Sequence, residues 1–138
     1  MRLVLDTDVI IAALRSPGGA SAALLQGVRL GRAIALLSVP MALEYEAKCT
    51  QAQHYSAAGL SDWEAVEFVT AVIALAEPVK IHYLWRPRLK DPNDEMVLEV
   101  AVNGSADAIV TFNQKDYGAI PGEFGVDVLL PREVIRRI

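Results

Sequence analysis

Short, uninterrupted apolar runs alternate with helical segments along the whole chain, and this alternation most constrains the fold. The runs that predict strands are residues 2–5, 34–37, 79–83, 108–111 and 126–130. Segments typical of helices lie between them, at residues 9–14, 21–30, 40–54, 61–76 and 94–103, and another begins at residue 131. Strands that are apolar throughout are typical of parallel sheets covered on both faces. We therefore expect an α/β fold in a single domain that spans residues 1–138.

Composition narrows the class of protein further. Hydrophobic residues make up 53% of the chain and the mean hydropathy is +0.30, a surplus that predicts an interface with a second copy or a partner. No run approaches the roughly 18 apolar residues of a membrane span, so we expect no membrane association. The single cysteine, Cys49, excludes an internal disulfide and is expected to be a small buried residue. A cytoplasmic protein is the simplest interpretation.

Several acidic residues lie at the boundaries of the predicted elements. Asp6 follows the first strand directly, Asp94 lies in the first turn of a helix, and Asp107 precedes the fourth strand. Ligands of open parallel sheets bind outside the carboxyl ends of the strands. If the fold brings these acids together, they form a pocket suited to divalent metals and phosphodiester chemistry. Ordinary helix capping also explains Asp6 and Asp91, and the sequence leaves both interpretations open.

Two glutamates follow on the predicted helix of residues 40–54. Glu44 and Glu46 point roughly 200° apart on a helix, so one pocket accommodates only one of them. Periodicity does not choose between them. The two histidines, His54 and His82, have no partner at a zinc-binding spacing. The chain also contains no G-x-S-x-G, P-loop or G-x-G-x-x-G motif, so serine-hydrolase and nucleotide-fold interpretations have no support.

A basic segment precedes the acids of the fourth helix-strand unit. Trp85, Arg86, Arg88 and Lys90 lie just before Asp91. A net charge of -4 is unusual for a nucleic-acid-binding protein, but bound cations reverse the local charge of a carboxylate site. This segment is therefore either a backbone-binding patch for RNA or a loop of solvated charges.

Four segments in order resemble the PIN domain, of the type found as the toxin in toxin–antitoxin pairs. They are LDTDV at residues 5–9, LEY at 43–45, DPND with LEVA at 91–94 and 98–101, and ADAIVTFN at 106–113. The family patterns that they resemble are LDTNV, EY, DPDD with LELA, and ADYLVTGD. The second pattern selects Glu44 over Glu46. Two positions depart from the family: Asp8 replaces an Asn, and Asn113 replaces an Asp, so that one carboxylate is lost unless Asp8 or Asp116 replaces it.

The resemblance implies a three-layer α/β/α sandwich with a five-stranded parallel sheet in the order 3-2-1-4-5. It implies a metal-dependent endoribonuclease with Mg²⁺ or Mn²⁺, in which the metal activates water for in-line attack on phosphorus. The expected metal ligands are Asp6, Glu44, Asp94 and Asp107, with Asn113 in support and Thr111 orienting Asp6. Arg86, Arg88 and Lys90 are expected to hold the RNA backbone and Trp85 to stack on a base. A cognate antitoxin and a homodimer are the expected partners.

Two other functions remain open from the sequence. Asp6-Thr7-Asp8 also resembles the D-x-D pair of haloacid-dehalogenase-type phosphatases, although Ile10 stands where that family has Thr or Val. A chain that lacks an acid at position 113 is also compatible with a PIN scaffold that binds RNA or protein without cutting. Trapping of a phosphorylated Asp6 would identify the phosphatase, and a failure to bind metal would favour the scaffold.

Overall fold

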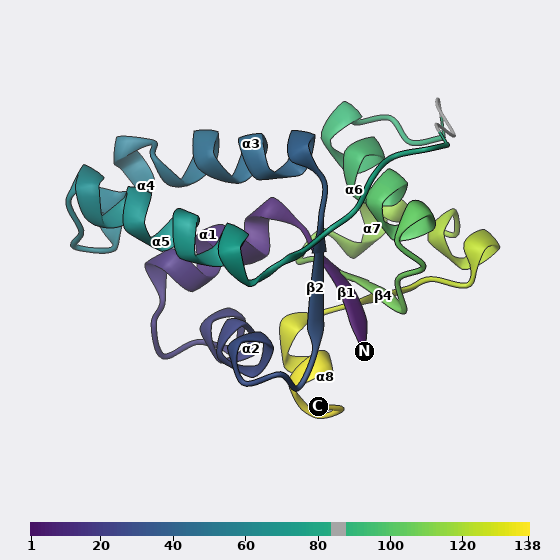
Figure 1. Cartoon of the computed structure of the whole chain (residues 1–138), viewed down its shortest axis with the longest axis horizontal. Coiled ribbons are helices and arrows are strands. Elements are labelled where there is room, and N and C mark those ends of the chain that lie inside the picture. Colours follow the sequence, from purple (N-terminus) through teal and green to yellow (C-terminus); the bar gives the residue numbers. More distant parts are fainter. Residues whose placement is uncertain (84–87) are drawn as a thin grey trace.

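The computed structural model describes residues 1–83 and 88–138, and its centre is a five-stranded parallel sheet (Figure 1). The strand order is β3-β2-β1-β4-β5, and every neighbouring pair is parallel. The strands are β1 (Arg2–Leu5), β2 (Ile34–Leu37), β3 (Glu77–Pro78), β4 (Ala108–Val110) and β5 (Asp127–Leu129). The expected α/β fold and the expected strand order are both confirmed.

Helices cover the sheet on two sides. The described α-helices are α1 (Thr7–Arg15), α2 (Ala20–Arg29), α3 (Val39–Cys49), α4 (Ala52–Ala57), α5 (Asp62–Leu75), α6 (Pro92–Asn103), α7 (Gln114–Tyr117) and α8 (Pro131–Ile135). A 3-10 helix, η1, spans Pro121–Phe124. In Figure 1, α1, α2 and α5 lie on one side of β1 and β2, and α6 lies on the other. The sheet is therefore the middle layer of a three-layer sandwich.

Two elements differ from the sequence expectation. The predicted helix of residues 40–54 is two helices, because α3 ends at Cys49 and the hydroxyl of Thr50 donates to the carbonyl of Glu46 at 2.7 Å. The third strand is residues 77–78 rather than 79–83, since the pairing begins at Glu77 opposite Leu36. The β2 strand ends at Leu37, so the apolar residues that follow β3 have no strand left to pair with.

The core lies on both faces of the central strands. Leu3, Val4 and Leu5 of β1 are completely or almost completely buried. The expected burial of Cys49 is confirmed, and burial raises the pKa of its thiol to about 11. The predicted capping box at Ser61 and Glu64 is present at the start of α5. These features fix the helices around the sheet and leave its two edges for polar residues.

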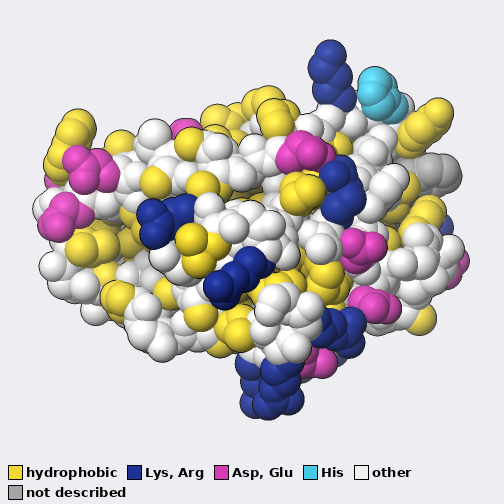
Figure 2. Space-filling view, turned by 60° about the horizontal axis from the view of Figure 1, so that its bottom comes forward, with side chains coloured by type: hydrophobic (Ala, Val, Ile, Leu, Met, Phe, Trp, Pro, Cys, Tyr) yellow, Lys and Arg dark blue, Asp and Glu magenta, His cyan; other side chains and the backbone are white. Residues whose placement is uncertain are grey.

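The surface of the molecule is mixed in character. Figure 2 shows Lys and Arg side chains gathered toward the lower end of one face, with hydrophobic side chains spread over much of the rest. Among the described residues, no single helix is long and apolar enough to cross a membrane. The pair α1 and α2 meets that test together by length and composition, with a bend of 102° between the two helices.

Candidate active site

Asp6 lies at the carboxyl end of the central strand β1 and caps the helix that follows. One of its carboxylate oxygens, Oδ1, accepts a hydrogen bond from the backbone N–H of Thr7 at 2.8 Å. The other, Oδ2, accepts from the hydroxyls of Thr111 and Tyr117, each at 2.9 Å. The structure therefore contains the contact from Thr111 to Asp6 that the sequence suggested. It adds Tyr117, for which the sequence offered no signal.

Asp8 lies two residues further on, in the first turn of α1. Its Oδ2 accepts from the backbone N–H of Phe112 at 3.0 Å, from the amide of Asn113 at 3.1 Å and, more weakly, from Thr111 at 3.4 Å. Its Oδ1 is buried and has no hydrogen-bond partner. Burial, and secondly the charge of Asp6, raise the pKa of Asp8 to about 6. The Asp8 carboxylate is thus held in place by one oxygen while the other remains unsatisfied.

Asp94 brings a third carboxylate from the start of α6. Asp91 caps that helix by accepting from the backbone N–H of Asn93 at 2.8 Å, which turns the next acid inward. Asp94 itself is only 9% exposed. Burial raises its pKa to about 6, with further contributions from the charges of Asp6, Asp91 and Asp116. The electrostatic coupling between Asp94 and Asp6 shows that the two carboxylates share one site.

Neutral groups supply the hydrogen bonds to this cluster. Within residues 1–83 and 88–138, none of the Lys and Arg side chains forms an ion pair with Asp6, Asp8 or Asp94. Burial and the charge of Asp6 raise the pKa of Tyr117, so its hydroxyl remains a proton donor. Two carboxylates about 4 Å apart repel by about 4 kcal/mol at an effective dielectric constant of 20. Such a cluster binds a cation or retains a proton.

The donor set fits Mg²⁺ or Mn²⁺ in a particular way. The unsatisfied buried oxygen of Asp8 and the nearby carboxylates of Asp6 and Asp94 are hard oxygen donors, which these ions prefer. Among the described residues, however, no group of three acidic, His or Cys side chains is arranged to hold a metal ion by itself. Magnesium sites are commonly built from one or two carboxylates plus waters and substrate phosphates. The residues present fit a site of that kind.

A cavity of about 460 Å³ extends from Asp94 toward basic side chains. Lys90 and Lys115 line it on either side of the carboxylates. Arg88 also lines it, but its guanidinium binds both carboxylate oxygens of Glu123 at 2.9 Å and stacks over the ring of Phe124. The cavity therefore combines acids that suit a cation with lysines that suit a phosphate.

Glu95 fixes the basic segment beside this cavity. It follows Asp94 on α6 and is only 3% exposed. Its Oε1 accepts from the backbone N–H groups of Arg88 and Leu89. The start of α6 thus positions both the carboxylate of Asp94 and the loop that carries Lys90. Trp85 and Arg86, the other residues predicted to bind RNA, lie outside the described residues.

Glu44 lies on α3, next to an anchor to the central strand. The hydroxyl of Tyr45 donates to the backbone carbonyl of Leu5, the last residue of β1, and so ties α3 to the residue before Asp6. The Glu44 side chain is partly exposed and has no hydrogen-bonded or ionic partner among the described residues. Its carboxylate is therefore free to bind an ion or a water molecule.

Asp107 does not join the other acids. It precedes β4, so it lies at the amino end of the sheet, and its Oδ2 accepts from the backbone N–H of Arg2 at 2.7 Å. Arg2 and Asp6 are separated by the length of β1, about 13 Å at the rise of a strand. The sequence prediction that Asp107 is a metal ligand is therefore corrected: residues that precede parallel strands lie at the edge opposite to residues that follow them.

Asn113 does reach the site, at the end of β4 where Asp107 does not. Its backbone N–H donates to the hydroxyl of Thr111 at 3.0 Å, and its side-chain amide donates to Asp8. Sequence reasoning named Asp8 and Asp116 only as substitutes for a missing acid. The signal for Asp8 was available, since an acid two residues after Asp6 falls in the first turn of the same helix. Lys115, Tyr117 and Glu95 had no such signal.

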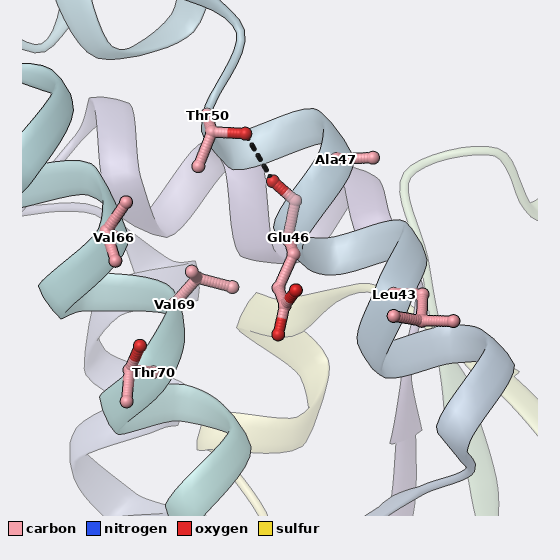
Figure 3. A pocket seen from close by; sticks show the side chains of 7 residues that line it. All are labelled: Leu43, Glu46, Ala47, Thr50, Val66, Val69 and Thr70. Carbon is pink, nitrogen blue, oxygen red and sulfur yellow. Dashed lines mark hydrogen bonds between the residues drawn. The ribbon is translucent and has the colours of Figure 1, made fainter.

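A separate hollow of about 450 Å³ lies between α3 and α5 (Figure 3). Leu43, Val66 and Val69 contribute apolar side chains to it, and Figure 3 shows the side chain of Glu46 directed into the space between the helices. Glu46 is the single acid among the residues that line it. This arrangement agrees with the choice of Glu44 over Glu46 for the carboxylate site, and the α3–α5 hollow is not a candidate catalytic centre.

Comparison with known proteins gives the same result as the geometry. A chain in the crystal structure of VapBC2 from Rickettsia felis bound to a DNA fragment from their promoter has a similar fold, with a TM-score of 0.64 and 13% sequence identity. The match covers 93% of this chain and 97% of that chain. No protein of curated function matches the sequence significantly. The family model of the PIN domain matches residues 2–115, which is most of the chain, and this protein therefore belongs to the PIN domain family.

Proposed function

We propose that this protein is a metal-dependent endoribonuclease that hydrolyses RNA phosphodiesters with Mg²⁺ or Mn²⁺. The observation that carries the proposal is the cluster of Asp6, Asp8 and Asp94 at the carboxyl edge of the sheet, bonded to neutral donors. An acid cluster of this kind is unfavourable for stability unless a cation binds to it. Membership of the PIN domain family supports the same proposal, because PIN domains are nucleases.

Each side chain of the site has a proposed task. Asp6, Asp94 and Glu44 hold the metal or its water molecules, while Thr111 and Tyr117 orient Asp6 through the two hydroxyl contacts. A divalent ion at this position supplies an activated water and stabilises charge on the phosphate and the leaving oxygen. Asp107 is excluded from this set, because it is bonded at the opposite edge of the sheet.

The cavity beside Asp94 is the proposed place for the RNA backbone. Lys90 and Lys115 line it, and a lysine ammonium is a good partner for a phosphate. Arg88 contributes less, because its guanidinium is already paired with Glu123 at 2.9 Å. The proposed RNA-binding roles of Trp85 and Arg86 rest on the sequence alone.

The proposal is tested by incubating the purified chain with a mixed-sequence RNA in millimolar Mn²⁺ and in EDTA. We expect internal cleavage in Mn²⁺ and none in EDTA, detected by gel electrophoresis and by mapping of the new ends. RNA binding without cleavage would favour a non-catalytic scaffold. A phosphorylated Asp6 trapped from a phosphomonoester would favour the phosphatase.

We further propose that the chain is the toxin of a toxin–antitoxin pair and is cytoplasmic. The structure similar in fold is a VapBC2 complex bound to a promoter fragment, which suits a toxin paired with a DNA-binding antitoxin. Val39, Leu43 and Trp63 are exposed apolar side chains on α3 and α5, and they support binding of an antitoxin and of a second copy. Light scattering of the chain alone tests the dimer, and co-purification with the product of the neighbouring gene tests the antitoxin.

A further inference from the structure

The two positions at which the sequence departs from the PIN pattern contact each other in the structure. Asp8 stands in place of an Asn on α1, and Asn113 stands in place of an Asp after β4. Although 105 residues separate them, the amide nitrogen of Asn113 lies 3.1 Å from the Oδ2 of Asp8. The acid and the amide are therefore exchanged within one hydrogen-bonded pair, and the pair still contains one carboxylate.

The contacts of Asp8 leave one oxygen for a ligand. Its Oδ2 accepts three hydrogen bonds, which fixes the orientation of the carboxylate. Its Oδ1 is buried without a partner. A buried acceptor without a partner costs about 1–3 kcal/mol, and more when it is charged. An acid that only stabilises the first turn of a helix has no need to bury an unsatisfied oxygen, since exposure to solvent serves that purpose.

Asn113 is the side chain that this arrangement requires. An acid at position 113 would place a second carboxylate about 3 Å from Asp8, and their repulsion would be about 5 kcal/mol at an effective dielectric constant of 20. An amide instead donates to Asp8 and leaves its own oxygen for solvent or substrate. The same contact explains why an acid at one of the two positions goes together with an amide at the other.

We propose that Asp8 is a metal-binding residue that replaces the missing acid of position 113, with Asn113 as the residue that positions it. The inference rests on the proposed function, because it concerns the same Mg²⁺ or Mn²⁺ site. It restores the carboxylate that the sequence appeared to lack. It also gives the unsatisfied oxygen of Asp8 a partner.

Calorimetric titration of the metal-free chain with Mn²⁺ tests the proposal independently of cleavage. We expect Asp8→Asn to weaken Mn²⁺ binding at least about tenfold. The double variant Asp8→Asn with Asn113→Asp restores one acid and one amide to the pair, and we expect its affinity to lie within about threefold of the wild type. Asp107→Asn, at the opposite edge of the sheet, is the matched control and should bind Mn²⁺ as the wild type does.

Three outcomes would overturn the inference. In the first, Asp8→Asn lowers the melting temperature in EDTA but binds Mn²⁺ normally, which would make Asp8 a helix-stabilising residue only. In the second, the double variant binds as weakly as Asp8→Asn. In the third, the wild type binds no Mn²⁺, which would remove the proposed function as well, whereas the first two leave that function intact.

A crystal structure of the wild type with Mn²⁺ keeps the test decisive even if a variant does not fold. We expect the ion at about 2.1 Å from the Oδ1 of Asp8. An ion bound by Asp6 and Asp94 with Asp8 at a greater distance would contradict the inference. In that case the exchanged pair would have a structural role alone.

Discussion

The two edges of the sheet both carry acids, but they treat them differently. At the amino edge, Asp107 accepts from the backbone of Arg2, and the guanidinium of Arg2 binds Glu77 at 2.6 Å and the carbonyl of Gly104 at 3.0 Å. At the carboxyl edge, Asp6 and Asp8 are bonded to hydroxyls, an amide and backbone N–H groups. The amino edge neutralises its acids with the protein's own charge, and the carboxyl edge leaves them to an external cation.

The largest expected effect separates the edges by activity. Asp6→Asn should lower Mn²⁺-dependent RNA cleavage at least about 100-fold, because it removes a charge from the proposed metal site. Asp107→Asn should change the rate by less than about threefold, because its carboxylate binds only the backbone of Arg2. Initial rates on a labelled RNA provide the measurement. Equal losses in the two variants would mean that the edges do not differ in function.

The second prediction concerns the stability of the metal-free chain against pH. The pKa of Asp8 and that of Asp94 are raised from 3.8 to about 6, so between pH 4 and pH 6 the folded chain binds more protons than the unfolded chain. The free energy of unfolding should therefore fall as the pH rises through this window, by about 2 kcal/mol in total after solvent screening. Urea unfolding in EDTA at pH 4, 5, 6 and 7 measures the fall.

Asp94→Asn sharpens this second prediction. It removes one of the two raised pKa values together with its repulsion from Asp6, so about half of the fall should disappear. Asp107→Asn should retain the whole fall, and saturating Mn²⁺ should abolish it in the wild type at pH 7. A stability that rises between pH 4 and pH 6 would show that the carboxyl-edge acids are neutralised by the protein itself.

A smaller effect is expected at Tyr117. Tyr117→Phe removes the hydroxyl that donates to the Oδ2 of Asp6 at 2.9 Å, while Thr111 still donates to the same oxygen. We expect a loss of about 1 kcal/mol in the free energy of unfolding and a decrease of about tenfold in cleavage. Stability is measured by urea unfolding and cleavage by initial rates. A variant with reduced stability but unchanged cleavage would indicate that Thr111 alone orients Asp6.

The smallest effect is expected at the amino edge. Glu77→Gln breaks the ion pair with Arg2, in which both side chains are more than one third exposed. Exposed ion pairs contribute roughly 0–1 kcal/mol, so the melting temperature should fall by a few degrees at most and cleavage should not change. Thermal unfolding at low and high salt measures the contribution. A loss of cleavage here would connect the amino edge to the site and end the contrast between the edges.

Much of the site followed from local pattern. Asp6 and Asp94 were predicted because an acid after a buried strand and an acid in the first turn of the next α/β unit lie at the carboxyl edge of a parallel sheet. Asp107 was predicted wrongly, because the motif that contains it spans a whole strand, with one end at each edge. Tyr117 and Glu95 were not predicted, since a single tyrosine or glutamate contacts a site only through the path of loops that have no periodicity.

The sequence by itself determined the α/β class, the strand order through its family resemblance, and the edge at which Asp6 acts, because apolar runs and turn residues encode the alternation of strands and helices. The tertiary structure alone decided which acids remain without a cationic partner. Asp8 and Asn113 are 105 residues apart, and only the pairing of β1 with β4 brings the start of α1 beside the end of β4. The local sequence gives a residue its chemistry, and the packing of distant strands decides whether that chemistry is neutralised or left for a ligand.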